Sequence, residues 1–295
     1  SEAQPLVVNL HADSILRDVT TTSGSIWLQQ HNADALVIDR VLAGTGGGHT
    51  VSITSKGSLL QAEQSSIVRG NSVLLTATNA TSTIGTANDF FDVAVTSAFE
   101  AVAADSIYLN TAGDLHAQNI ASSAGNITLD VGGNVSIDWI DARQGMLSMY
   151  ADGAILDRRN GLVVPQADQQ AIVRAKKGVL KSLVGIGMEE NWLETSFEEM
   201  ESQSFGDMWV KNFGDMIVGG LVADIEGVQA RGNLYLELAS TLTINESFHS
   251  TDDAIELSAS EGIIVNANVS TDGHNISLTA GTAIELTNNG SLDTG

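Results

Sequence analysis

The sequence has no cysteine, only 2 prolines among 295 residues, and few aromatic residues, which make up 5% of the chain. Without cysteine, neither disulfides nor thiolate chemistry can contribute. Because large aromatic side chains are rare, the apolar core must be built from Ile, Val, Leu and Ala. This composition favours small repeated layers over one large globular core.

Basic residues are also scarce: 13 Lys and Arg stand against 36 Asp and Glu, which gives a net charge of -23. Nucleic acids and anionic membrane surfaces carry charge of the same sign and would repel such a chain. No apolar run approaches the ~20 residues that a membrane-spanning helix needs. We therefore expect no nucleic-acid partner and no membrane insertion of this segment.

What the sequence does contain is short runs in which apolar and polar residues alternate, best seen in residues 125–138. Two such runs flank Gly132-Gly133-Asn134, residue types that suit a corner of the chain. Alternation puts the apolar residues of a strand on one face. The pattern predicts that four residues point into the core (Ile127, Leu129, Val135 and Ile137) and three toward solvent (Thr128, Asp130 and Ser136).

These runs recur along the whole chain. Their first apolar residues are Ile26, Val51, Val73, Ile107, Ile127, Leu147, Ile172, Trp209, Leu234, Ile255 and Ile276. The spacings are 25, 22, 34, 20, 20, 25, 37, 25, 21 and 21 residues. A period of 20 to 25 residues with short strands and Gly, Asn and Asp corners predicts an all-β parallel solenoid of about eleven coils. The two long spacings predict side insertions at residues 84–105 and 184–206.

A longer period lies over the first, because Ile84-Gly85 recurs as Ile186-Gly187 and Asn110 recurs as Asn212. Both pairs are offset by 102 residues. We therefore expect one continuous solenoid segment over residues 1–295, cut from a longer array and built of three related blocks. The blocks are residues 14–113, 114–214 and 215–295, the last one incomplete.

The two predicted insertions differ in chemistry. The first contains four apolar residues that could cover a flank of the coil: Phe90, Phe91, Val95 and Phe99. The second is acidic, and its apolar residues recur at near-helical spacing: Met188, Trp192, Leu193, Phe197 and Met200. This spacing predicts one short helix over residues 189–201.

The Gly-x-Ile-x-Leu runs, the segment Ile186 to Thr195, and the following strand with Asn212 and Gly214-Asp215 resemble the repeat regions of filamentous-haemagglutinin-like proteins. These are very large bacterial surface or secreted proteins. The resemblance implies a right-handed parallel β-helix at the cell surface or outside the cell. It also implies a non-enzymatic role as a shaft, spacer or adhesin repeat. The implied partners are flanking repeats of the same chain and a glycan or protein on a host or neighbouring cell.

The one basic cluster holds six of the 13 basic residues: Arg158, Arg159, Arg174, Lys176, Lys177 and Lys181. It could form a docking groove for an anionic glycan. An acidic stretch follows it closely, so mutual neutralisation of the two charge runs is the favoured interpretation.

The alternative function is a carbohydrate-binding or polysaccharide-lyase-type β-helix that uses the basic region 158–181. A lyase removes the proton beside a uronate with a basic residue. The candidate set is Arg143, Arg158 and Arg174 with Asp138, Asp141 and Asp157. No spacing requires this set to assemble, so solvated corner residues are the favoured interpretation and no enzyme activity is predicted.

Metal and cofactor chemistry has little support in the sequence. The six histidines are scattered without metal-ligand spacing. The pair Asp252-Asp253 lies in no EF-hand loop. We expect no cofactor, with at most weak Ca²⁺ binding at corner carboxylates.

Overall fold

The computed structural model describes residues 6–7, 11, 14–44, 47–159 and 171–295. These residues contain no helix and form an all-β, parallel solenoid of about 12 turns, which confirms the predicted fold class. The chain divides into two compact units. Unit 1 comprises residues 1–133 and 139–145, and unit 2 comprises residues 134–138 and 146–295.

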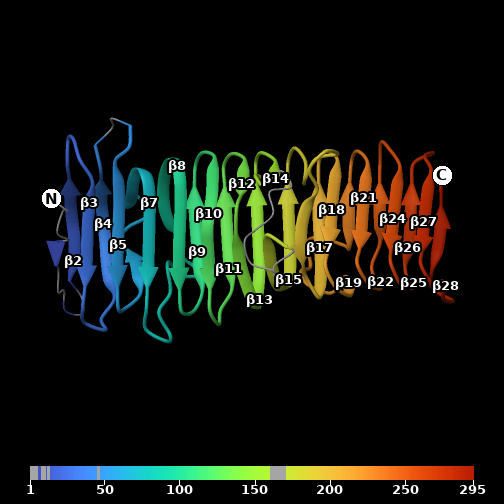
Figure 1. The fold of residues 1–295 in the computed structure, drawn as a ribbon, viewed down its shortest axis with the longest axis horizontal. Coiled ribbons are helices and arrows are strands. Elements are labelled where there is room, and N and C mark those ends of the chain that lie inside the picture. Colours follow the sequence, from blue (N-terminus) through green and yellow to red (C-terminus); the bar gives the residue numbers. More distant parts are fainter. Residues whose placement is uncertain (1–5, 8–10, 12–13, 45–46, 160–170) are drawn as a thin grey trace. The chain divides into compact units, whose positions relative to one another are not determined.

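In unit 1 the turns lie side by side, coloured blue to green in Figure 1. Most turns are too short to form a sheet alone, so each depends on parallel pairing with its neighbours. The strands are β1 (Leu6–Val7), β2 (Ile15–Thr20), β3 (Ile26–Gln30), β4 (Leu36–Leu42), β5 (Thr50–Ser55), β6 (Leu59–Gln61), β7 (Ile67–Ala77), β8 (Phe91–Ala103), β9 (Ile107–Thr111), β10 (Leu115–Ser122) and β11 (Ile127–Val131).

In unit 2 the later coils contain three strands each, so β20 pairs with β23, β21 with β24 and β22 with β25. The strands are β12 (Val135–Ile137), β14 (Ile155–Asp157), β15 (Val173–Ser182), β16 (Leu193–Ser196), β17 (Glu199–Ser204), β18 (Met208–Asn212), β19 (Met216–Val218), β20 (Val228–Ala230), β21 (Leu234–Leu238), β22 (Leu242–Ile244), β23 (Phe248–Ser250), β24 (Ile255–Ala259), β25 (Gly262–Val265), β26 (Asn268–Thr271), β27 (Ile276–Ala280), β28 (Ala283–Leu286) and β29 (Ser291–Asp293). Strand β13 (Ile140–Ala151) has residues in both units.

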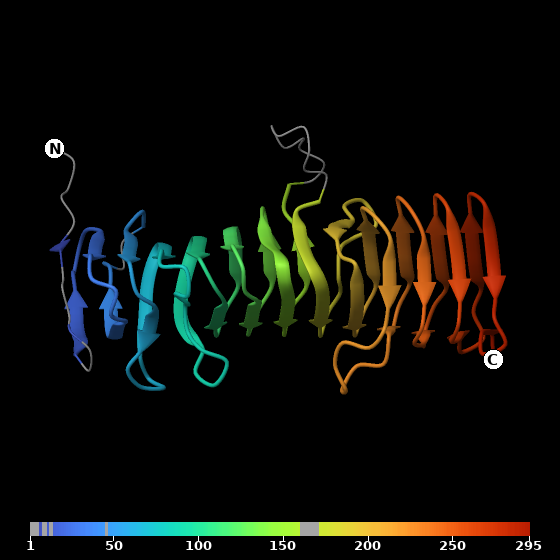
Figure 2. The same ribbon diagram turned by 90° about the horizontal axis from the view of Figure 1, so that it is seen from below.

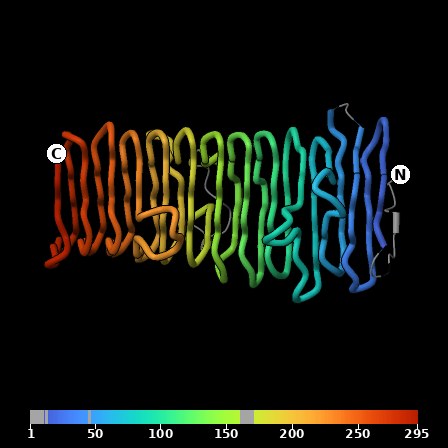
Figure 3. Tube along the Cα trace, turned by 180° about the vertical axis from the view of Figure 1, so that it is seen from behind, coloured from blue at the N-terminus to red at the C-terminus, as the bar shows by residue number. Residues whose placement is uncertain are grey.

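The core of each unit consists of columns of apolar side chains, one from each turn, and the tube in Figure 3 traces these turns. In unit 1, one column runs through Leu36, Leu59, Ile84, Ile107 and Ile127, each aligned with the next. In unit 2, a similar column runs through Ile186, Met208, Leu234, Ile255 and Ile276, again with each residue aligned with the next. Such columns bury every turn against the turns before and after it, which is why one repeat could not fold alone.

The alternation predicted for residues 125–138 is confirmed. In unit 1, Ile127 and Leu129 are fully buried while Asp130 is exposed. In unit 2, Val135 and Ile137 are fully buried. Thr128 and Ser136 are half-buried, because coils above and below cover part of each outward-facing side chain.

Residues 84–105, predicted to be a side insertion, lie within the stack instead. Ile84 bridges to Leu59 and Ile107, and Val73 aligns with Phe99 of β8. The spacing of 34 residues runs from Val73 to Ile107, which belong to two different columns. It therefore contains one complete turn of the solenoid that the sequence did not reveal. Phe91 and Phe99, expected to cover a flank of the coil, are core residues with 1% and 0% exposure.

The helix predicted over residues 189–201 is wrong, because this segment contains β16 and the start of β17. Ile186 bridges to Ile155 and Met208, so residues 184–206 also belong to the stack. The apolar spacing fits a strand as well as a helix: Leu193, Thr195 and Phe197 are buried, and Glu194 and Ser196 between them are half-buried. This period of two, supported by pairing to β15 and β18, overrides the weak helical periodicity.

Candidate functional site

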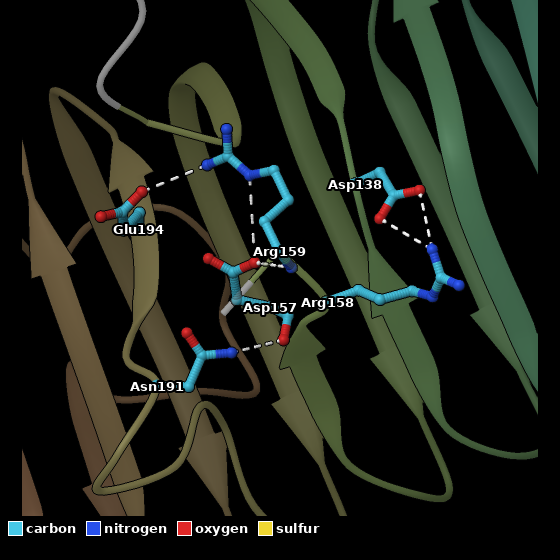
Figure 4. A network of polar contacts seen from close by, with 6 residues as sticks. All are labelled: Asp138, Asp157, Arg158, Arg159, Asn191 and Glu194. Atoms are coloured by element: carbon cyan, nitrogen blue, oxygen red, sulfur yellow. Dashed lines mark hydrogen bonds and ion pairs between the residues drawn. The ribbon is translucent and has the colours of Figure 1, made fainter. Parts of the chain in front are cut away.

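The predicted basic cluster lies in unit 2, at the end of β14 and along β15. Arg158 follows β14 and points toward Asp138, as Figure 4 shows, with 3.3 Å between its Nη1 and the carboxylate Oδ2. Its side chain is 55% exposed. An exposed ion pair of this kind contributes at most ~1 kcal/mol, so it neutralises charge more than it stabilises the fold.

Arg159 is largely buried, with a side-chain exposure of 13%. Its Nη2 lies 3.1 Å from Oε2 of Glu194, and its Nε lies 3.9 Å from Oδ1 of Asp157 (Figure 4). The backbone N–H of Arg159 donates to Asp157 Oδ1 at 2.6 Å. Burial raises the pKa of Asp157, and this N–H and guanidinium partly oppose that rise. The Asn191 side chain donates to the Asp157 carbonyl at 2.7 Å, which ties the turn before β16 to this network.

The other members lie on β15. Lys177 pairs with Glu199 of β17 at 2.8 Å. Within the described residues, Arg174, Lys176 and Lys181 have no ion-pair partner. Part of the predicted basic region, residues 160–170, lies outside the described residues. Three of the six cations are therefore neutralised by carboxylates, and a role of the cluster in ligand binding stays a prediction.

Four of the six residues considered for lyase chemistry form two ion pairs with each other. In unit 1, Arg143 and Asp141 lie two residues apart, and Arg143 Nε donates to both carboxylate oxygens at 3.1 and 3.0 Å. This contact raises the pKa of Arg143, so the arginine stays charged and cannot act as a general base. In unit 2, Arg158 Nη1 lies 3.3 Å from Asp138 Oδ2.

Sequence reasoning missed a carboxylate pair in unit 2 that holds the segment 219–227 between β19 and β20. Glu201 is fully buried and accepts the N–H groups of Leu221 and Val222 at 2.8 and 2.9 Å. Glu246 accepts those of Gly220 and Gly227 at 3.0 Å each. Burial raises the pKa of Glu201, and the nearby Glu246 raises it further. Figure 2 shows this segment, in orange, extending away from the neighbouring strands.

No local signal predicts this pair, because Glu201 and Glu246 are far apart in sequence and meet only through the stacking of turns. The arrangement fixes the loop through four backbone N–H groups.

An aromatic cluster in unit 2 was also not predicted. The Trp209 and Tyr235 rings stack with centroids 3.8 Å apart and 6° between their planes. Trp192 meets Trp209 edge-on at 5.5 Å. Trp209 and Tyr235 stand opposite each other on the paired strands β18 and β21, which is the pairing that brings the rings together.

Among the residues that the structure describes, no three His, Asp or Glu side chains gather in a way that could hold a metal ion. The same residues include no helix long and apolar enough to cross a membrane.

Comparison of the chain with protein-family models, with curated proteins and with solved structures gave no match. The likeness to filamentous-haemagglutinin-like repeats therefore depends on the residues quoted above, and the structure supports only its coarser part, a parallel β-solenoid.

Proposed function

We propose that the chain is a non-enzymatic structural segment, a shaft, spacer or adhesin repeat, of a large bacterial cell-surface or secreted protein of the filamentous-haemagglutinin-like kind. The main support is the uniformity of the stacking. In unit 2, Leu234, Ile255 and Ile276 follow one another at 21-residue intervals in unbroken parallel pairing. Regular columns of this kind distribute stability along the chain, as a shaft or spacer requires.

The ionisable groups agree with this proposal. Arg17, Arg40 and Arg143 in unit 1, and Arg158 and Arg159 in unit 2, each face a carboxylate. Pairing of this kind neutralises the surface cations, as expected of a structural repeat whose charges serve no chemical step.

Flanking repeats of the same chain are the proposed neighbours. The side chains of Ile284, Leu286 and Leu292 in β28 and β29 are 45%, 48% and 45% exposed, respectively. Equivalent positions in the preceding coil, Ile263, Val265 and Val269, are fully buried. A further coil of the same kind would cover this apolar surface.

Pulling single molecules by the chain ends tests the structural role. We expect cooperative unfolding steps in multiples of one coil, which is about 70 Å of extended chain for 21 residues. Leu257→Asp should lower the unfolding force because Leu257 is fully buried, and Ser258→Asp on the outward face is its matched control. Continuous lengthening at low force, without steps, would contradict the proposal.

The alternative is a carbohydrate-active solenoid that uses the basic residues of β15. Arg174, Lys176 and Lys181, which have no carboxylate partner among the described residues, favour it. Incubation with acidic polysaccharides decides between the two. Cleavage that is lost in Arg174→Ala and kept in Arg143→Ala would establish the alternative, and absence of products is expected.

A further inference from the structure

Unit 1 has a groove on its surface that the structural role does not explain. It has a volume of about 500 Å³. Its walls come from the turn before β7, from the start of β8 and from the end of β9, and its polar lining includes Gln64, Ser65, Arg69, Asp92, Thr96 and Asn110. This volume lies in the range of small-molecule sites in proteins.

A break in strand pairing shapes one wall. Gly70 aligns with Val95, but Ser72 aligns with Ala98, so β8 carries one residue more than β7 over this stretch. Such a bulge bends the strand and redirects side chains, and bulges are frequent next to binding sites. Asn71 donates to Thr96 Oγ1 at 2.9 Å and holds the bulged residues in place.

Arg69 is the unusual residue of the groove. The other arginines of unit 1 pair with carboxylates: Arg17 with Glu63, Arg40 with Asp18, and Arg143 with Asp141. Arg69 is exposed and has no carboxylate or other hydrogen-bond acceptor among the described residues. In a chain with 36 acidic residues, a cation without a carboxylate partner beside a groove is an available anion contact.

The remaining lining suits a sugar. Asp92 Oδ1 accepts from the Asn110 side chain, and the Asp92 N–H donates to Gln61 Oε1 at 2.9 Å, which fixes the carboxylate. Its Oδ2 has no hydrogen-bond donor among the described residues and can accept from a hydroxyl. Ile67 and Val95 are half-buried and add an apolar wall for the C–H face of a sugar ring.

We propose that this groove binds an acidic saccharide, with the carboxylate of a hexuronate on the Arg69 guanidinium and its hydroxyls on Asp92 and Thr96. Guanidinium and carboxylate match in a planar, two-bond geometry. Asp92 selects against a compact inorganic anion, because its carboxylate repels negative charge in the part of the groove where the sugar hydroxyls would bind. The proposal is independent of the shaft role and of the basic residues of β15.

Calorimetric titration with trigalacturonate, and with galactotriose as the uncharged counterpart, tests the site on the whole chain. Trigalacturonate should bind at least about tenfold more tightly than galactotriose, and Arg69→Gln should remove this preference, since a hydrogen bond to a charged group has about that effect. Arg17→Gln is the matched control: it removes the same charge from an exposed, ion-paired side chain of the same unit.

A second variant, Thr96→Trp, fills the groove while Arg69 keeps its charge, and it should abolish binding. The proposal is overturned by equal binding of both saccharides, by equal weakening in Arg69→Gln and Arg17→Gln, by unchanged binding in Thr96→Trp, or by no binding at millimolar trigalacturonate. Thermal melting of each variant establishes that it is folded, so loss of binding is not confused with loss of structure.

Discussion

The turn at Ile84-Gly85 in unit 1 and the turn at Ile186-Gly187 in unit 2 share one backbone and differ in their side chains. Both glycines have a left-handed backbone, with φ of 69° and 68°. Each turn then closes through a short antiparallel bridge, Thr86 with Asp89 and Met188 with Asn191. The same backbone conformation therefore recurs at an offset of 102 residues.

The aromatic contacts at the two turns differ. In unit 1, Phe90 lies 5.9 Å from Tyr108. In unit 2, Trp192 lies beside Trp209, which stacks on Tyr235 of the next coil. Backbone geometry is thus the constrained part of the repeat, and the outward aromatic contacts are the variable part. Four predictions test this division, and they are ordered from the largest expected effect to the smallest.

The buried residue that follows each turn and begins the next strand should contribute most to stability. Phe91 and Leu193 are the first residues of β8 and β16, and they are 1% and 0% exposed. Phe91→Ala should lower the free energy of unfolding by about 3–5 kcal/mol and Leu193→Ala by about 2–5 kcal/mol, because each leaves a cavity in a packed column. Urea denaturation measures both.

The matched controls are Asn88→Ala and Glu190→Ala, exposed residues of the same two turns, which should change stability by less than about 0.5 kcal/mol. If a control lowers the free energy of unfolding as much as the core substitution in the same turn, the turn conformation and not the burial of Phe91 or Leu193 determines the stability.

The two glycines come next. A Cβ on Gly85 would lie 2.4 Å from the carbonyl oxygen of Tyr108, and one on Gly187 would lie 2.1 Å from that of Trp209. Both contacts are with backbone, which cannot move aside, and the left-handed φ adds strain. Gly85→Ala and Gly187→Ala should each cost about 2–3 kcal/mol in urea denaturation. Gly113→Ala, where a Cβ meets no atom within 4 Å, should be nearly neutral.

The sequence predicted the columns well because burial in a repeat is local: alternation alone identified Ile127 and Leu129 as core residues. It failed where two columns were mixed. Trp209 was aligned with Leu234, but Met208 is the residue that pairs with Leu234, and Trp209 faces Tyr235. The offset of 102 residues also holds only for the turns. Phe91 pairs with Leu109, and Leu193 pairs with Val210, so the following strands are offset by 101.

The side-chain networks could not be predicted for a different reason. The Glu201 and Glu246 pair and the groove beside Arg69 depend on which residues of separate coils are brought together. A shift of one residue in a coil exchanges inward and outward positions, so a small error in period removes any prediction of such contacts. The basic cluster could be recognised because its residues are close together in the sequence. The acidic residues that follow it could be recognised for the same reason.

The aromatic contacts should contribute less than the backbone. Trp192 is half-buried, touches Trp209, and donates its Nε1–H to the Glu189 carbonyl at 3.0 Å. Trp192→Ala should cost about 2 kcal/mol and Phe90→Ala about 1 kcal/mol, from lost apolar burial and ring contact. Urea denaturation of both variants provides the comparison. If Phe90→Ala lowers the free energy of unfolding more than Trp192→Ala does, the larger aromatic cluster of unit 2 does not stabilise its turn more than the Phe90–Tyr108 contact stabilises the turn in unit 1.

The smallest effect concerns the ionisation of Tyr235. Its partial burial beside Trp209 raises the pKa of the phenol, and the neighbouring Glu256 and Asp253 raise it further. A phenol with a raised pKa in the folded state stabilises the fold below its unfolded value of about 10, and this contribution is lost as the pH rises through the folded value. The protein should therefore lose stability in alkaline solution as Tyr235 ionises.

Absorbance of the phenolate, measured as the difference between the parent chain and Tyr235→Phe, follows this residue separately from the other two tyrosines. Glu256→Gln removes the largest charge effect on Tyr235. It should leave the ring stack intact, because Glu256 is exposed and aligns with Tyr235 through the backbone pairing of β21 and β24. The Tyr235 titration should then move to lower pH, toward but not reaching the value of a free tyrosine, since burial is the larger cause. Trp192→Ala should move it further in the same direction if Trp192 shields the phenol from water. An unchanged titration in both variants would show that the aromatic cluster does not shield Tyr235, and the distinction between the two turns would then be one of shape alone.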